Sequence, residues 1–283
     1  SILVKENLDL FEKIHAKKGN VTGLPTGYVD LDNITSGFQR SDFIVIAARP
    51  SMGKTAFACN IAQNLAVTQN VPVLIFSLEM SKEQLVQRML CSEARIDSSL
   101  MRKGILSDRD MGKLIQAAGI LEKTPIFIDD TPALSIFELR ARARRLKSRE
   151  NIQMVIVDYL QLMRGRARYE NRQQEITDIS ASLKAMAKEL SIPVIALSQM
   201  NRLIERREDK KPILADLRES GSIEQDADLV LFLHRDEQYD DSEEAKGITD
   251  ILIAKHRNGP LGQVRLTFLK QYLRFENYTQ KHP

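Results

Sequence analysis

Six short apolar runs, separated by longer segments with helical periodicity, constrain the fold of this chain more than any other feature. The runs are rich in β-branched residues and do not alternate with polar ones, a pattern typical of parallel strands buried on both faces. Helical segments separate most of the runs, so the sequence predicts an α/β fold whose mostly parallel sheet is covered by helices on both faces. The runs are residues 43–48, 73–78, 125–128, 153–158, 192–198 and 228–233.

Helix signals and a change of pattern toward the C-terminus complete the predicted fold. Two serines have a glutamine or glutamate three positions later, which is the spacing of a capping box at a helix start. These pairs are Ser81 with Gln84 and Ser135 with Glu138. An unbroken apolar stripe predicts a further helix over about 172–190. Three final segments follow one another through short turns and predict antiparallel hairpin strands at the sheet edge. They are residues 248–254, 263–269 and 272–276.

The first 19 residues form a segment apart from the rest. Val4, Leu8, Phe11 and Ile14 make one apolar stripe, which predicts an amphipathic helix that ends near Gly19. A turn-rich stretch follows, so this helix is expected either to fold back on its own domain or to dock on a neighbour. Residues 20–283 show no second-domain boundary and are predicted to form one domain.

Composition excludes some classes of protein but does not by itself indicate a particular function. The net charge of the 283 residues is only +3, so a nucleic-acid site would have to come from local clustering. No apolar run approaches the roughly 18 residues of a membrane-spanning helix. Cys59 and Cys91 lack metal-ligand spacing, and we expect both to be buried, reduced thiols of a cytoplasmic protein. Because the first residue is Ser1 rather than Met, we expect a fragment or a processed chain.

The strongest motif is a phosphate loop at residues 48–55. It follows a predicted strand and opens a helix, which is the context that such a loop requires. Gly53 lets successive backbone N–H groups turn toward phosphates, Lys54 reaches the β- and γ-phosphates, and the Thr55 hydroxyl is a ligand for Mg²⁺. Ala48 stands where the motif usually has its first glycine, and a chance Gly-Lys-Thr sequence is the alternative. The predicted nucleotide contacts are Ser51, Met52, Gly53, Lys54, Thr55 and Ala56.

Three polar residues at predicted strand ends are candidates for the chemistry of nucleotide hydrolysis. Asp158 ends an apolar strand and is predicted to hold Mg²⁺, with a helix cap as the alternative. Glu79 could orient an attacking water, or could be a solvated turn residue. Gln199 could sense the γ-phosphate, or could hydrogen-bond a loop.

With these motifs in place, the chain resembles the bacterial replicative DNA helicases of the DnaB type over roughly residues 1–277. Arg-Pro-Ser-Met-Gly-Lys-Thr in the phosphate loop, Ser-Leu-Glu-Met at 77–80 and Asp-Tyr-Leu-Gln at 158–161 carry the resemblance. Further motifs follow in the family's order. They lie at 171–176, 197–199, 216–228 and 255–260. Together they are far more specific than the phosphate loop alone, and the family tolerates alanine in place of the first glycine.

The resemblance implies a RecA-like ATPase core, in a ring of six that uses ATP and Mg²⁺ to move along single-stranded DNA. It implies that Glu79 is the catalytic base, Asp158 the magnesium-site acid and Gln199 the switch between nucleotide and DNA loops. Arg257 resembles an arginine finger supplied to the neighbouring subunit's ATP, with Lys255 beside it; two solvated charges on a hairpin are the alternative. Residues 1–19 resemble the linker helix that docks on the adjacent subunit. The family's N-terminal domain, which engages primase, is absent from these 283 residues.

Two basic loops after strand ends are the candidates for DNA binding. In a ring such loops would face the central channel, where each cation could neutralise a DNA phosphate without reading sequence. Ordinary solvated loops are the alternative. The candidate contacts are Arg164, Arg166, Arg168 and Arg172 in the first loop, and Arg202, Arg206, Arg218, Glu219 and Gly221 in the second. A third basic cluster at 140–149 surrounds its predicted helix on all sides and is interpreted as a solvated or subunit-facing surface.

Other functions remain open from the sequence. A RecA-type strand-exchange or clock-type ATPase would bind DNA or protein without unwinding. A small-molecule kinase would need an acceptor pocket and usually a lid, and no such insertion is evident. Our expectation is a hexameric helicase motor, with primase and a helicase loader as partners of the full-length protein and no membrane partner.

Overall fold

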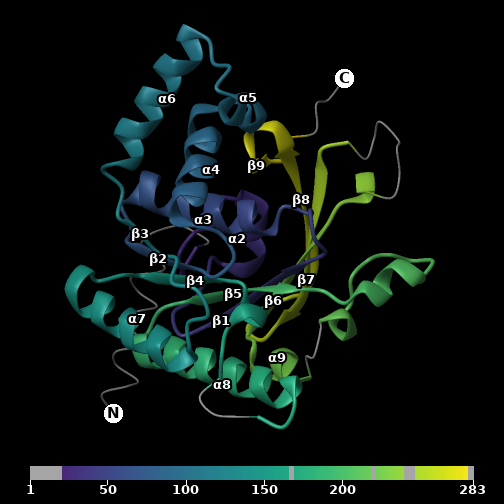
Figure 1. Ribbon diagram of the computed structural model, residues 1–283. Helices are drawn as coiled ribbons and strands as arrows, with labels where there is room; N and C mark the ends of the chain where they lie inside the picture. The colour runs from purple at the N-terminus through teal and green to yellow at the C-terminus, as the bar shows by residue number, and fades with distance from the viewer. Residues whose placement is uncertain (1–20, 166–168, 218–220, 239–245, 280–283) are drawn as a thin grey trace.

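A nine-stranded sheet organises the chain (Figure 1). The computed structural model describes residues 21–165, 169–217, 221–238 and 246–279. The strand order is β3-β2-β4-β5-β1-β6-β7-β8-β9. The predicted helix over 1–19 lies outside the described residues, so the division of the chain at residue 19 stays a prediction.

All six predicted parallel strands are present. β1, β2, β4 and β6 are buried along their whole length, as their continuous apolar runs predict, whereas the edge strand β3 is half-buried. Each of the six is parallel to its neighbours among them. They are β3 (Ile126–Asp129), β2 (Val73–Ser77), β4 (Met154–Asp158), β5 (Val194–Gln199), β1 (Phe43–Ala48) and β6 (Leu229–His234).

The predicted antiparallel strands extend the sheet beyond β6. They are β7 (Ile248–His256), β8 (Gly262–Leu269) and β9 (Arg274–Asn277). β7 is two residues longer than the sequence pattern predicts, because His256 and Lys255 pair with Leu229 and Val230 at the start of β6. Lys255 therefore lies inside a strand rather than after it, and Arg257 follows the strand directly.

Helices cover both faces of the sheet (Figure 1). One layer contains α2 (Val29–Thr35), α3 (Lys54–Gln69) and α4 (Lys82–Ala94), with α5 (Ser98–Lys103) and α6 (Asp108–Leu121) beyond α4. The other contains α7 (Ile136–Glu150), α8 (Arg172–Leu190) and α9 (Gly221–Asp226). Short 3₁₀ helices complete the elements. They are η1 (Leu160–Leu162), η2 (Arg202–Arg206), η3 (Leu214–Asp216), η4 (Asp236–Gln238) and η5 (Lys270–Tyr272).

Alternate side chains of the central strands fill two separate cores. Ile44 and Ile46 of β1 belong to the core under α3, whereas Val45 belongs to the core under α8. This division follows from the period of two in a strand, which sends successive side chains to opposite faces. Both predicted capping boxes are present, at the starts of α4 and α7.

Both cysteines are buried and free, as predicted. Burial raises the pKa of the Cys59 thiol to about 12. Among the helices of the described residues, none has the length and apolar character needed to cross a membrane.

Asp42, which directly precedes β1, provides a test of this packing. Burial, and then the nearby Asp228 carboxylate, raise the pKa of Asp42 to about 6. An unfolded aspartate has a pKa of about 3.9, so Asp42 reduces the stability of the folded state as the pH rises from about 4 through 6. We expect Asp42→Asn to increase the free energy of unfolding by about 1 kcal/mol at pH 8, allowing for solvent screening. Urea denaturation at pH 8 and pH 4 measures this gain, which should fall close to zero at pH 4. An equal gain at both values would contradict the prediction.

Candidate functional site

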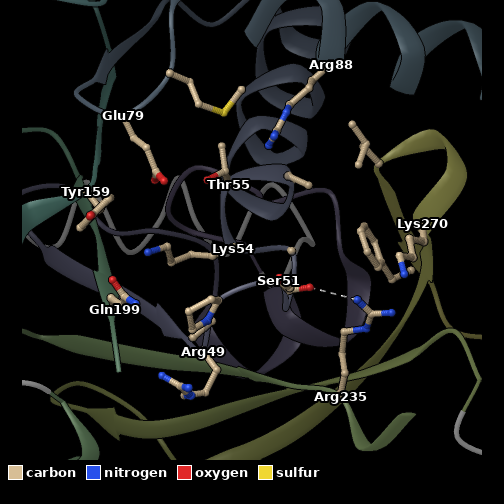
Figure 2. Close-up of a pocket in the computed structure, with 17 residues that line it drawn as sticks. Arg49, Ser51, Lys54, Thr55, Glu79, Arg88, Tyr159, Gln199, Arg235 and Lys270 are labelled. Atoms are coloured by element: carbon tan, nitrogen blue, oxygen red, sulfur yellow. Dashed lines mark hydrogen bonds between the residues drawn. The ribbon is translucent and has the colours of Figure 1, made fainter. Parts of the chain in front are cut away.

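A cavity of about 490 Å³ lies at the carboxyl ends of the parallel strands. Its volume falls within the range of roughly 300 to 1,000 Å³ that is usual for small-molecule sites. The loops after β1, β2, β4 and β5 form one side, and β8 with η5 forms the other (Figure 2). Ligands of open parallel sheets bind at this end, because helix starts and loop N–H groups gather there.

The phosphate loop forms the floor of this cavity. Gly53 has a φ of 94° and ends the loop as the N-cap of α3, while Ser51 also has a positive φ of 68°. The Lys54 side chain points into the cavity in Figure 2. Burial lowers the pKa of Lys54, and the carboxylates of Asp158 and Glu79 partly oppose this effect.

The predicted nucleotide contacts divide into two groups. Met52 is 3% exposed and its side chain packs in the hydrophobic core, so only its backbone is available to a ligand. The other five line the cavity, namely Ser51, Gly53, Lys54, Thr55 and Ala56.

Thr55 and Asp158 meet beside the phosphate loop. The Thr55 hydroxyl donates to Asp158 Oδ2 at 2.7 Å. Asp158 is 2% exposed, and its Oδ1 atom is buried without a hydrogen-bond partner among the described residues. Burial raises the pKa of Asp158. A hydroxyl and a carboxylate with one unsatisfied oxygen fit the oxygen ligands that Mg²⁺ prefers.

Glu79 and Gln199 also line the cavity. Glu79 follows β2, is exposed, and points its carboxylate into the cavity toward Thr55 (Figure 2). Gln199 is the last residue of β5. The Gln161 amide donates to Ser198 Oγ at 2.8 Å and to the Gln199 carbonyl at 3.4 Å, so η1 is bound to the end of this strand.

Sequence reasoning missed four cations that line the cavity. They are Arg49, Arg88, Arg235 and Lys270. Arg235 is 1% exposed, donates to the Ser51 carbonyl at 3.5 Å, and lies 4.7 Å from the centroid of the Phe268 ring. Its only sequence signal was a charge at the end of an apolar strand. The Phe268 contact joins residues distant in sequence.

Lys255 and Arg257 lie away from the cavity of their own chain. The Lys255 amine donates to the carbonyls of Glu224 and Gln225, and Arg257 forms an ion pair with Asp228 at 3.0 Å. The two cations thus lie on the same side, against the end of α9. Half of the Arg257 side chain is exposed.

The described candidates for DNA binding differ in their surroundings. Arg164, Arg202 and Arg206 are exposed, and Gly221 is the exposed first residue of α9. Arg172 is half-buried and donates to the Gln161 carbonyl at 2.6 Å, so it holds the first loop together. The remaining candidates lie outside the described residues, namely Arg166, Arg168, Arg218 and Glu219.

The third basic cluster lies on the surface of α7. Arg140 and Arg144 pair with Glu189 of α8, and Arg142 pairs with Asp129 of β3. Such exposed pairs contribute little to stability, about 0 to 1 kcal/mol each. The cluster stays interpreted as a solvated or subunit-facing surface.

Comparisons with known proteins agree with this geometry. The profile of the DnaB-like helicase C terminal domain matches residues 23–277. The chain is 54% identical to the replicative DNA helicase DnaB of Geobacillus stearothermophilus, covering 99% of this chain and 62% of that protein. It is 53% identical to the replicative DNA helicase DnaC of Bacillus subtilis (strain 168), covering 98% and 61%. The chain therefore spans about three fifths of the length of these relatives.

Two solved structures share the fold. One, an ATPase domain, has a TM-score of 0.93 and 41% identity, with 98% of this chain and 99% of that chain covered. The other, a DnaB-like replicative helicase whose structure was reported with its interactions with primase, has a TM-score of 0.91 and 40% identity, with 97% and 66% covered. The predicted RecA-like core is thereby confirmed, and this chain belongs to the family of DnaB-like helicase C-terminal domains.

Proposed function

We propose that this chain is the ATP-hydrolysing motor of a hexameric replicative DNA helicase, which moves along single-stranded DNA in the cytoplasm and unwinds the duplex at the replication fork. The cavity in which Lys54, Thr55, Asp158 and Glu79 converge carries this proposal. A RecA-type ATPase that binds DNA without unwinding it is the alternative.

The phosphate loop would bind the triphosphate of ATP. The N–H groups around Gly53 and the start of α3 supply partial positive charge, and Lys54 would contact the β- and γ-phosphates. Thr55 and Asp158 would hold Mg²⁺, which when bound neutralises charge on the phosphate oxygens. Lys270, on the opposite side of the cavity, adds positive charge near the nucleotide. Arg235 contacts the phosphate loop at the Ser51 carbonyl, and its charge is paired with Glu237.

Glu79 would act as the general base. Its carboxylate faces the cavity, where it could orient a water molecule for attack on the γ-phosphoryl group and accept its proton. Gln199, at the end of β5, would contact the same phosphoryl group. Because Gln161 bonds to Gln199 and Arg172 bonds to Gln161, a change at the γ-phosphate has a short path to the first basic loop.

Single-stranded DNA would bind to the two basic loops. The exposed side chains of Arg164, Arg202 and Arg206 are suited to phosphate contacts, which are independent of sequence and weaken with salt. Tyr169 donates to Asp178 at 2.7 Å, so its hydroxyl is held by α8. Tyr169 is also the one aromatic residue in the sequence of the two loops, so we expect backbone tracking rather than base stacking.

Assembly into a ring would complete the active site. Arg257 lies outside its own cavity and half of its side chain is exposed, which suits an arginine finger for the neighbouring subunit. The predicted amphipathic helix over 1–19 needs an apolar surface, and α6 exposes Met111 and Ile115 one turn apart on the same face. We propose that this helix docks on α6 of the adjacent subunit. Primase and a helicase loader are the proposed partners of the full-length protein.

Gly53→Ala tests the phosphate loop. A Cβ atom at residue 53 would lie 3.0 Å from Phe275 Cζ and 3.3 Å from Phe268 Cζ, and its φ is unfavourable for a side chain. We expect ATP turnover to fall about 100-fold or more, because the phosphate-binding N–H groups shift. Gly104→Ala, at a residue that also has a positive φ but where a Cβ meets nothing within 4 Å, is the matched control and should retain turnover. Wild-type turnover in Gly53→Ala would contradict the assignment.

ATP turnover with and without single-stranded DNA, on protein sized by light scattering, tests the proposed function. We expect DNA to stimulate turnover in a species of about six chains, because hydrolysis needs the neighbour's arginine. Strand-separation assays on forked DNA then distinguish the helicase from a non-unwinding ATPase. Unstimulated turnover by a monomer would contradict a ring motor.

Arg257→Ala tests whether Arg257 acts as an arginine finger on the neighbouring subunit's ATP. This variant should bind nucleotide normally but lose most turnover, because charge on the γ-phosphoryl group is less stabilised. Glu79→Gln protein, itself inactive, should restore some turnover on mixing, since it supplies an intact Arg257 to the variant's sites. The absence of rescue at every mixing ratio would argue against a finger acting between subunits.

A further inference from the structure

Arg257 is bound at several points to one short stretch of chain. Its Nη1 atom donates to Asp228 Oδ1 at 3.0 Å and its Nη2 atom to the Gln225 carbonyl at 3.2 Å. Its backbone N–H donates to the Asp228 carbonyl at 2.8 Å. Contacts to both terminal nitrogens of a planar guanidinium fix its orientation as well as its position.

Asp228 is itself held rigidly. It is 3% exposed, and its Oδ2 atom accepts from the Phe43 N–H of β1 at 2.8 Å and from the Lys184 amine of α8. Its own N–H donates to the Phe43 carbonyl at 2.8 Å. One carboxylate oxygen therefore anchors Asp228 to the sheet and α8, while the other holds Arg257.

The remaining contacts come from the C-terminal end of α9. The last carbonyls of a helix have no partner within the helix and attract cations. Here Lys255 donates to the carbonyls of Glu224 and Gln225, and Arg257 to that of Gln225. A shift of α9 along its axis would therefore change the contacts that both cations make with it.

The other end of α9 begins where the second basic loop ends, at Gly221. Ile223 is fully buried, so the helix is packed against the core. The Thr177 hydroxyl of α8 donates to Ser222 Oγ at 3.0 Å, and α8 begins at Arg172, where the first basic loop ends. Both basic loops thus lead into two helices that are bonded to each other.

We propose that Asp228 is the positioning residue for Arg257, and that α9 transmits the position of the basic loops to it. This inference rests on the proposed function, in which Arg257 acts on the neighbouring subunit's ATP. Binding of DNA to a basic loop would set the position of α9. Together with Asp228, α9 would set the position of the Arg257 guanidinium. DNA bound to one subunit would thereby control hydrolysis in the next.

Asp228→Asn is the first variant. It keeps the shape and the acceptor for the Phe43 N–H but removes the charge that holds Arg257. We expect kcat to fall at least about tenfold, with the KM for ATP changed less than about twofold, because the variant's own cavity is intact. Adding Arg257→Ala to Asp228→Asn should cause no further loss, since the aspartate acts through the arginine.

Mixing separates positioning from a merely structural role. Glu79→Gln protein should restore turnover to Asp228→Asn protein at mixed interfaces, because it supplies a well-placed Arg257. Damage to the variant's own fold would not be rescued. Asp250→Asn is the matched control, because Asp250 is a buried aspartate on β7 that pairs with Arg265 at 3.5 Å. It should keep full turnover.

A second variant tests the connection to the loops without disturbing the core. Thr177 is exposed, and Thr177→Val removes the hydroxyl that bonds to Ser222. We expect stimulation by single-stranded DNA to fall at least about twofold while DNA-free turnover is unchanged, and Thr177→Ser should restore it. Unchanged stimulation in Thr177→Val would overturn the transmission through α9.

The outcomes distinguish this inference from the proposed function. If Arg257→Ala loses turnover but Asp228→Asn does not, the role of Asp228 is overturned and the finger stands. If Asp228→Asn loses turnover and Glu79→Gln protein fails to rescue it while rescuing Arg257→Ala, the role is structural and the inference is overturned. If Arg257→Ala itself retains turnover, both are overturned.

Discussion

Burial of the parallel sheet on both faces is the constraint on which the site depends. The central strands offer no exposed face, so polar groups on them are placed where the strands end. Asp158 and Gln199 are the last residues of β4 and β5, and Glu79 follows β2 by two positions. Because neighbouring parallel strands end at the same edge, these three residues meet the phosphate loop without any specific attraction between them.

The same constraint explains why the strands, and the polar residues at their ends, were predictable from the sequence. A continuous apolar run identifies a buried strand, and its first polar residue identifies a candidate for the site. The helix over 172–190 and both capping boxes were confirmed because their signals are local, set by spacings of three and four residues. Met52 shows the limit of a motif, since the phosphate-loop pattern does not reveal that its side chain turns into the core.

What could not be predicted involves contacts between distant residues. Arg235 lies beneath the phosphate loop because the antiparallel strands bring Phe268 to its guanidinium, and no spacing of sequence encodes that approach. Lys255 was expected after its strand, but pairing with Val230 draws it into β7. Arg49 is a conspicuous residue of the phosphate loop, yet its partner Glu205 lies in the second basic loop. Such pairs are determined by tertiary packing, which overrides local pattern.

The phosphate loop and the basic loops are therefore parts of one bonded structure. Arg49 of the phosphate loop pairs with Glu205 of η2, and Gln161 joins the end of β5 to Arg172. Both connections lie within one chain, so they can respond only to the nucleotide bound to that same chain. The contacts of Arg257 with Asp228 and α9 differ, because the arginine faces outward. A ring that hydrolyses ATP at its sites in order needs two kinds of connection. One responds to the nucleotide bound to the subunit itself, and the other acts on the neighbouring subunit. In this chain the two connections would use separate contacts, so a substitution could impair one and spare the other.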